Sequence, residues 1–227
     1  MNRYYWFKLD MSIELSRLKE ELIKSAFNEN VGRGFVVHSY RKDYLSGRFV
    51  VSKKVIDNLE MPYGDFVKNE RIIYDYIDFE IYKKNNYFLE LINPGRCLNE
   101  FLNCLYQASD YSLVVDKIDL RLPEVIISMS SDALYLDRIK QIDLKNVYYS
   151  SSVYANMTLK GDLSIDTYSD GLINANSHVF SKLKASFFVN GTKGDVEIFN
   201  NCRVNVSNSI SRGFTSLFKE KIIDFFV

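Results

Sequence analysis

The sequence contains little proline, cysteine or histidine, and it carries no net charge. Only 3 of the 227 residues are Pro and 10 are Gly, which leaves little material for flexible linkers. The 29 basic and 29 acidic side chains cancel, so the chain lacks the strong positive field of most sequence-tolerant nucleic-acid binders. Hydrophobic residues at 47% and charged residues at 26% instead match a globular protein with a substantial core.

The usual motifs of catalytic and cofactor sites are also missing. The sequence has no Gly-x-x-x-x-Gly-Lys-Ser/Thr phosphate loop, no Gly-x-Ser-x-Gly nucleophile elbow and no His-Glu-x-x-His zinc motif. Its two histidines, His38 and His178, leave few candidates for histidine-based acid–base chemistry. These absences favour a protein that is not an enzyme and that needs no cofactor and no bound metal.

The cysteine pattern and the hydropathy predict where the protein works. Cys97, Cys104 and Cys202 form neither an even disulfide framework nor a Cys-x-x-Cys pair, which fits reduced thiols in the cytoplasm. No run of about 18 uncharged apolar residues occurs, and the N-terminus lacks the apolar stretch of a signal peptide. We therefore expect a cytoplasmic protein without a membrane partner.

What the sequence has in abundance is large aromatic side chains and a segmental division of charge. It contains 16 Tyr and 16 Phe, which supply large flat surfaces for packing and for interfaces. Residues 1–54 hold 11 basic and 6 acidic side chains, residues 55–137 hold 7 and 15, and residues 138–227 hold 11 and 8. These segments are either ordinary solvated surface or oppositely charged faces that dock on each other or on a second subunit.

Periodicity in the first half predicts alternating strands and helices. Alternation of apolar and polar residues predicts strands at 3–9, 34–40, 48–56, 70–82 and 87–92. The second and third strands form a hairpin through a turn at 43–47. Helical spacing predicts a helix capped by Ser12 that ends at Asn30 and Gly32, and another opened by Asn93 and Pro94.

The pattern of the second half predicts a β-meander followed by a helix. Residues 112–128 are expected to be strand around Pro123, and further strands are predicted at 138–149, 153–160, 163–168, 180–190 and 195–206. Turns are expected at Lys160-Gly161-Asp162, Asp170-Gly171 and Asn190-Gly191. The order strand, strand, helix at 72–106 and again at 181–225 is either a duplication or the ordinary recurrence of such elements.

These elements predict an α+β protein with two antiparallel β-rich lobes. Residues 1–122 form a β-α-β-β-α-β lobe that suits a ferredoxin-like sheet with an inserted hairpin. Residues 123–227 form a β-meander closed by the C-terminal helix.

One candidate site is the segment 33–54, where basic and aromatic side chains interleave. Aromatic rings stack on bases while cations contact phosphates, so such a sheet face suits single-stranded RNA or DNA. The alternative is that this segment is an ordinary core strand with solvated charges at its edges. The candidate nucleic-acid-binding residues are Arg33, Phe35, Tyr40, Arg41, Lys42 and Arg48.

Two other segments carry alternative functions. Asp75, Asp78 and Glu80 could ligate a divalent metal in a phosphodiesterase, although strand alternation separates Asp75 from the other two and a solvated face explains them as well. The last helix is apolar, so it packs either on its own sheet or on a protein partner. Its candidate partner-binding residues are Phe214, Phe218, Phe225 and Phe226.

Of these functions, the sequence favours a non-catalytic binding or assembly module. Neutral net charge, many Tyr and Phe residues and the missing catalytic motifs all agree with this interpretation. We expect the module to act within a homo-oligomer or a larger cytoplasmic complex. Single-stranded nucleic-acid binding is the first alternative, and a metal-dependent phosphodiesterase is the second.

Overall fold

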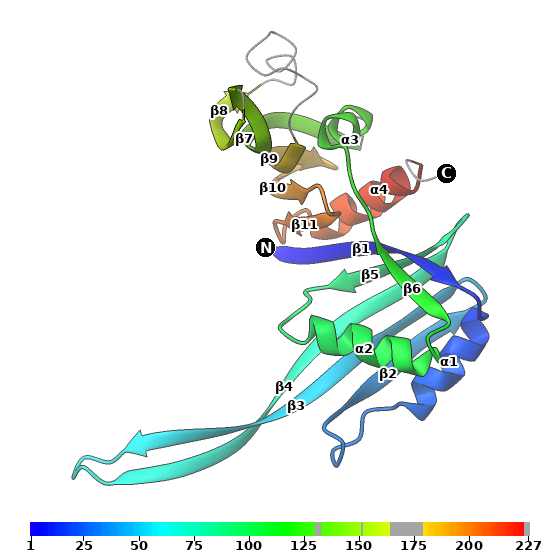
Figure 1. Cartoon of the computed structure of the whole chain (residues 1–227), viewed down its shortest axis with the longest axis vertical. Helices are drawn as coiled ribbons and strands as arrows, with labels where there is room; N and C mark the ends of the chain where they lie inside the picture. Colours follow the sequence, from blue (N-terminus) through cyan, green and yellow to red (C-terminus); the bar gives the residue numbers. More distant parts are fainter. Residues whose placement is uncertain (130–132, 151, 164–178, 225–227) are drawn as a thin grey trace. The chain divides into compact units, whose positions relative to one another are not determined.

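The computed structural model describes residues 1–129, 133–150, 152–163 and 179–224, and it is an α+β protein built mainly on antiparallel sheet, as predicted (Figure 1). The chain divides into two compact units. The first unit is Lys8–Asp116, and the second combines Met1–Phe7 with Lys117–Val227. The division into domains 1–122 and 123–227 stays a prediction. Within the described ranges, no helix is long and apolar enough to cross a membrane.

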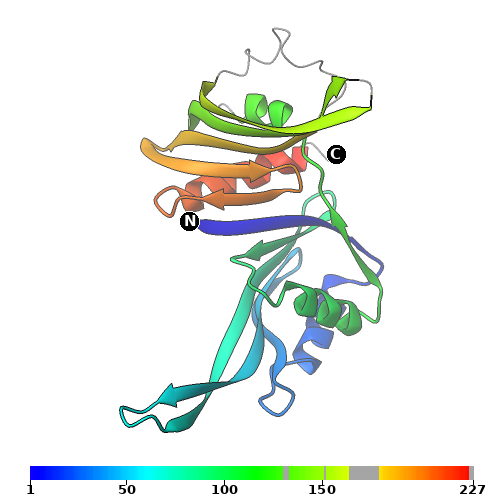
Figure 2. The same cartoon turned by 60° about the vertical axis from the view of Figure 1, so that its left-hand side comes forward.

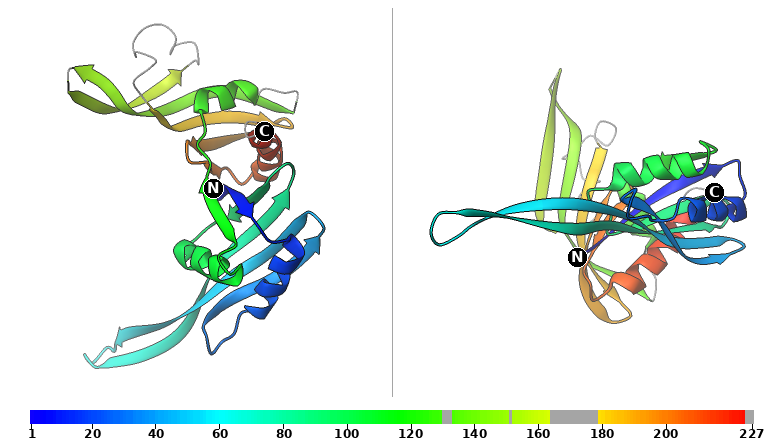
Figure 3. Two further views of the ribbon diagram at one scale, coloured as in Figure 1. Left: turned by 45° about the vertical axis from the view of Figure 1, so that its right-hand side comes forward. Right: turned by 90° about the horizontal axis from the view of Figure 1, so that it is seen from below.

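The first unit is a sheet with two helices on one of its faces (Figure 3). Its strands follow the order β2-β3-β4-β5-β1, and β6 also pairs with β1. Helix α1 contacts α2, β2 and β3, and α2 contacts the sheet through Phe101. In chain order the elements are β1 (Asn2–Met11), α1 (Leu15–Lys24), β2 (Arg33–Arg41), β3 (Tyr44–Glu60), β4 (Phe66–Lys83), β5 (Tyr87–Ile92), α2 (Leu98–Ala108) and β6 (Leu113–Lys117).

An aromatic cluster forms the centre of the first unit. Phe101 on α2 lies between Phe49 and Phe79 of the sheet, with ring centroids 5.7 and 5.5 Å away. Phe35 on β2 adds a fourth ring, 5.0 Å from Phe49. All four rings are fully buried, and tilted or edge-on ring pairs of this kind stabilise a core beyond their buried area. The predicted alternation of 70–82 is confirmed only from Ile77 onward, where Ile77, Phe79 and Ile81 face this core; residues 70–74 are exposed on both faces.

The hairpin turn predicted at 43–47 is wrong, and the core explains why. The turn is Lys42-Asp43, and β3 already begins at Tyr44. Gly47 lies within the strand opposite Phe79, where an added Cβ would come within 2.8 Å of the Phe79 ring. This glycine therefore makes room for an aromatic ring rather than for a turn.

Three other local predictions in this half are also wrong. Ser12 does not cap α1; its hydroxyl donates to the carbonyl of Ser112, 3.1 Å away, while Glu14 holds the cap position. That helix ends at Lys24, ahead of the predicted stop at Asn30 and Gly32. The second helix begins at Leu98 rather than at Pro94.

The second unit is an antiparallel sheet with two helices on the same face (Figure 2). Its strand order is β8-β7-β9-β10-β11-β1, and Asn2–Tyr5 of β1 pair with β11. Phe214 and Phe218 of the last helix pack on Phe187 of the sheet and on Trp6. The elements are α3 (Leu122–Ser128), β7 (Leu134–Ser150), β8 (Val153–Leu163), β9 (Val179–Val189), β10 (Thr192–Phe199), β11 (Arg203–Val206) and α4 (Ser211–Asp224).

The strand predicted across 112–128 is present only as β6, Leu113–Lys117. Its second part is wrong, because Pro123 lies in the first turn of α3, where a proline fits a helix best. Gly161 lies within β8 instead of a turn, and the segment 195–206 is divided into β10 and β11. The Asn190-Gly191 turn is confirmed, with both residues at positive φ as a two-residue hairpin requires. The predicted strand 163–168, apart from residue 163, and the Asp170-Gly171 turn fall outside the described residues.

The face of the second sheet away from the helices carries a row of ion pairs. Lys140 contacts Asp195 at 2.6 Å, Lys182 contacts Asp143 at 2.9 Å, and Lys184 contacts Glu197 at 3.3 Å. Partial burial raises the pKa of Asp195, but hydrogen bonds from Lys140 and Ser186 outweigh it and leave the pKa below its ordinary value. The same balance lowers the pKa values of Asp143 and Glu197.

We expect Phe101→Ala to lower the free energy of unfolding by about 3 to 5 kcal/mol, because it removes the central ring of a fully buried cluster. Phe66→Ala is the matched control, since the Phe66 side chain is exposed and should cost less than about 0.5 kcal/mol. Urea unfolding followed by circular dichroism measures both. Equal losses for the two variants would contradict the assigned core.

We expect the second unit to lose stability as the pH falls from about 6 to about 3. Carboxylates with a lowered folded-state pKa stabilise the fold above their ordinary pKa, and this contribution disappears as they are protonated. Asp195→Asn should therefore flatten the pH dependence of the unfolding free energy, measured by urea titrations across this range. An unchanged pH profile in this variant would show that Asp195 does not contribute.

Candidate interaction site

The structure does not gather the six candidate nucleic-acid-binding residues on one surface. Phe35 is only 2% exposed and belongs to the aromatic core, so its ring is not available for stacking on a base. Arg48 donates two hydrogen bonds to Asp78, and its guanidinium lies 4.3 Å from the centre of the Tyr76 ring. The other four lie at the surface of β2 or in the turn after it: Arg33, Tyr40, Arg41 and Lys42.

Two of the three candidate metal-ligating carboxylates are held by cations of the neighbouring strand. Asp75 accepts a hydrogen bond from Lys53 at 2.5 Å, which raises the pKa of that lysine. Asp78 is engaged by Arg48, and Glu80 also has an interaction partner. Over the described ranges, no group of three or more His, Cys, Asp or Glu side chains is arranged to hold a metal ion.

The candidate partner-binding phenylalanines divide between the core and the undescribed end of the chain. Phe214 and Phe218 are completely buried by the second unit itself, with stacked rings 5.5 Å apart. Their burial corresponds to the alternative that the helix packs on its own sheet. Phe225 and Phe226 lie outside the described residues.

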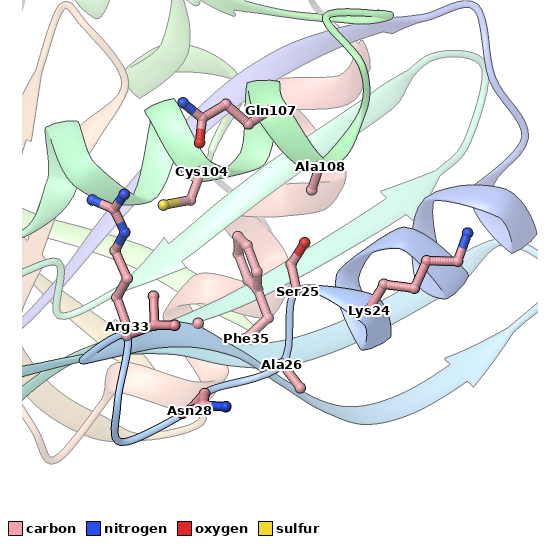
Figure 4. A pocket seen from close by; sticks show the side chains of 11 residues that line it. Lys24, Ser25, Ala26, Asn28, Arg33, Phe35, Cys104, Gln107 and Ala108 are labelled. Atoms are coloured by element: carbon pink, nitrogen blue, oxygen red, sulfur yellow. The ribbon is translucent and has the colours of Figure 1, made fainter.

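A cleft of about 410 Å³ lies in the first unit between the end of α1, the strand β2 and α2 (Figure 4). Arg33 lines one side and contacts Glu100 at 3.4 Å. Cys104 lines another side, and burial raises the pKa of its thiol, as it does for Cys97. Cys104 therefore favours the neutral thiol over the reactive thiolate.

A more distinctive feature is a two-stranded arm, residues 53–75, formed by the far halves of β3 and β4. Its pairing continues without interruption from Lys53↔Ile73 to Glu60↔Phe66. Figures 1 and 2 show this ribbon extending beyond the rest of the first unit. The helices that cover the sheet near Phe49 and Phe79 do not reach it, so both of its faces meet solvent.

Large apolar and aromatic side chains occupy these exposed faces. Tyr63 at the tip is 94% exposed, Phe66 is 67% exposed and Ile72 is 62% exposed. Further exposed apolar side chains are Ile56, Leu59, Met61, Val67, Ile73 and Tyr74. A concentration of this kind on a protein surface is typical of an interaction site, whereas single exposed apolar residues are not informative.

The arm also has two unpaired edges in the described part of the chain. Strand β2 pairs with β3 only as far as Val51, and β5 pairs with β4 only over Asp78–Lys83. Beyond these points, each strand of the arm is bonded to the other strand alone. Such edges present backbone donors and acceptors to any strand that approaches them.

Ion pairs across the ribbon fix its register in the absence of a core. Lys54 contacts Glu70 at 2.5 Å, and Arg71 contacts Asp57 at 2.9 Å. Both pairs are largely exposed, so each contributes little to stability. They keep cross-strand neighbours aligned and leave the apolar side chains between them accessible.

Sequence reasoning missed the arm, although a signal for it was present. The predicted strands stopped at 56 and resumed at 70, because the residues between them are too polar for a buried strand. Met61-Pro62-Tyr63-Gly64-Asp65 is a turn sequence at the centre of that gap. A hairpin exposed on both faces needs only this turn and the flanking β-branched residues.

Neither a protein-family model nor a curated protein matches this chain.

We expect the first unit to fold without the arm, because the arm contributes no side chain to the aromatic core. Val55 and Arg71 face each other, so replacing residues 56–70 by Asn-Gly would close the ribbon with a two-residue turn. The free energy of unfolding, measured in urea, should change by less than about 1 kcal/mol. Loss of the folded state would show that the arm is part of the folding unit.

Proposed function

We propose that this chain is a non-catalytic binding or assembly module that acts through the β3–β4 arm. The observation that carries the proposal is the combination of exposed apolar side chains with two unpaired strand edges on one projecting ribbon. Partners that add a strand to such an edge gain main-chain hydrogen bonds, and the side chains on the two faces supply specificity. No catalytic group is required for this role.

We place the module in a homo-oligomer or a larger complex in the cytoplasm. Its three cysteines are free in the structure, and Cys97 and Cys202 are buried. Unpaired thiols fit a reducing compartment, where disulfides are rare. An exposed apolar arm is costly for an isolated monomer, so a partner that covers it would explain its retention.

Single-stranded nucleic-acid binding has less support than protein binding. Of the six residues proposed for it, Phe35 is in the core and Arg48 is neutralised by Asp78. Of the four remaining candidates on β2 and its turn, Tyr40 is the one aromatic residue, and Lys19 already covers its ring at 5.3 Å. The phosphodiesterase alternative rests on Asp75, Asp78 and Glu80, and all three are engaged by other residues.

We also propose that the first unit is a ferredoxin-like sheet with an inserted hairpin. Its order β1, α1, strands, α2, β6 and the pairing of β1 with both β5 and β6 support this proposal. The extra strands then extend the sheet beyond β5. The arm would be the far end of that insertion, which is where an added binding element disturbs the core least.

We expect a photo-reactive amino acid in place of Tyr63 to form a covalent adduct of defined mass in cells, because Tyr63 is at the tip of the arm. The same group in place of Tyr111, which is 72% exposed but lies away from the arm, is the control and should form no such adduct. Mass spectrometry identifies the adduct. Equal labelling from the two positions, or none from Tyr63, would overturn the proposed function.

A further inference from the structure

The outer edge of β4 presents a regular row of backbone groups. In an antiparallel ladder, successive residues direct their N–H and C=O groups to opposite sides. The Lys84 N–H bonds to Asn86 at the start of the β4–β5 pairing, and the Met61 N–H bonds to Asp65 at the tip of the arm. The two hydrogen bonds give the same alternation. Odd-numbered residues of β4 direct their backbone groups toward β3, and the even-numbered residues from Phe66 to Tyr76 direct theirs away from it. Over this length, no described strand receives them.

The charges of the arm indicate what kind of partner fits this edge. Residues 53–75 contain four basic and five acidic side chains, so the arm is almost neutral, with both signs interspersed. A two-fold interface sets one patch against itself, and an arm of a single sign would repel its copy. The mixed charge therefore fits a second copy of this chain better than a polyanion such as nucleic acid.

One register of arm against arm satisfies the charges. When two β4 edges pair antiparallel about Asn69, Lys68 lies opposite Glu70 of the second copy, and the symmetry produces this contact twice. Phe66 then lies opposite Ile72 of the second copy, which pairs two exposed apolar side chains. Registers centred on Lys68, Glu70 or Arg71 would each place a like charge on the two-fold axis.

The ion pairing of the cations in the arm supports the same register. Lys53, Lys54 and Arg71 each contact an acidic side chain of their own arm. Lys68 forms no ion pair with any residue that the structure describes, and it is fully available on the strand whose edge is unpaired. Glu70 lies two residues away on the same face. It contacts Lys54 of its own arm, but its side chain is 53% exposed and can accept Lys68 of a second copy as well.

We infer that two copies of this chain associate through antiparallel pairing of their β4 edges, centred on Asn69, to form a four-stranded ribbon from two arms. The inference rests on the proposed function and names its partner. Each copy contributes the segment 66–72, with Lys68 and Glu70 as the residues that set the register.

Charge reversal tests this pairing directly. We expect the purified chain to sediment as a dimer, and Lys68→Glu or Glu70→Lys alone should raise the dissociation constant about tenfold, because each creates two like-charge contacts. Mixing the two variants should restore tight association as a heterodimer, since every glutamate then faces a lysine. Lys84→Glu, the same change outside the arm, is the control and should leave the dissociation constant unchanged.

A disulfide across the axis tests the register. Residues directly opposite in antiparallel strands lie about 4.5 to 5.5 Å apart, within the range of a disulfide. Asn69→Cys should therefore yield an oxidised dimer, whereas Asn58→Cys on β3, away from the paired edge, should not. Dimers that form equally well from Asn58→Cys, or variants that fail to rescue each other on mixing, would overturn this pairing.

Sedimentation together with the Tyr63 labelling experiment distinguishes a failure of self-association from a failure of the proposed function. A wild-type chain that sediments as a monomer up to high micromolar concentration would refute self-association. If the reactive group at Tyr63 nevertheless labels another protein, the arm remains a binding element with a different partner. If neither occurs, both proposals fail.

Discussion

The hydrogen-bonded ladder between β3 and β4 is the constraint on which the first unit depends. A single unbroken register runs from Tyr44↔Tyr82 to Glu60↔Phe66, and it serves two environments in turn. Near its start, one face of the ladder lies under α1 and α2 and carries Phe49 and Phe79. Farther along, the same alternation continues where no helix covers it. Core and arm are therefore one structural element, and any change of register in one would be transmitted to the other.

The two units place their charged side chains in different ways. In the second unit, the lysines and carboxylates of the open sheet face are paired with one another, and the pKa values of Asp143, Asp195 and Glu197 fall as a result. These lysines and carboxylates therefore balance one another's charges. The arm of the first unit differs, because its strand edges are unpaired in the described part of the chain and many of its apolar side chains are exposed. The groups available for binding a partner are thus concentrated in the arm, which has no core of its own.

Sequence patterns predicted an element correctly where the local residue pattern and the tertiary contacts favour the same structure. The alternation of 77–82 and the Asn190-Gly191 turn belong to this class, since periodicity and turn chemistry act over a few residues. Gly47 and Pro123 were misread, because each has two structural uses and only the neighbours in space choose between them. The same limit applies to the site. Phe35 looked like a stacking residue in the sequence, and only the ring of Phe101 above it shows that it is core.

The position of Trp6 gives the two units separable signals. It is the sole tryptophan of the chain, it is 1% exposed, and it lies between the Tyr4 and Phe218 rings of the second unit. The first unit, Lys8–Asp116, contains no tryptophan at all. Indole emission therefore monitors the packing of Trp6 with Tyr4 and Phe218, whereas signals from the peptide backbone average over both units. A difference between the two transitions in one unfolding experiment would measure how strongly the units cooperate, without any label or truncation.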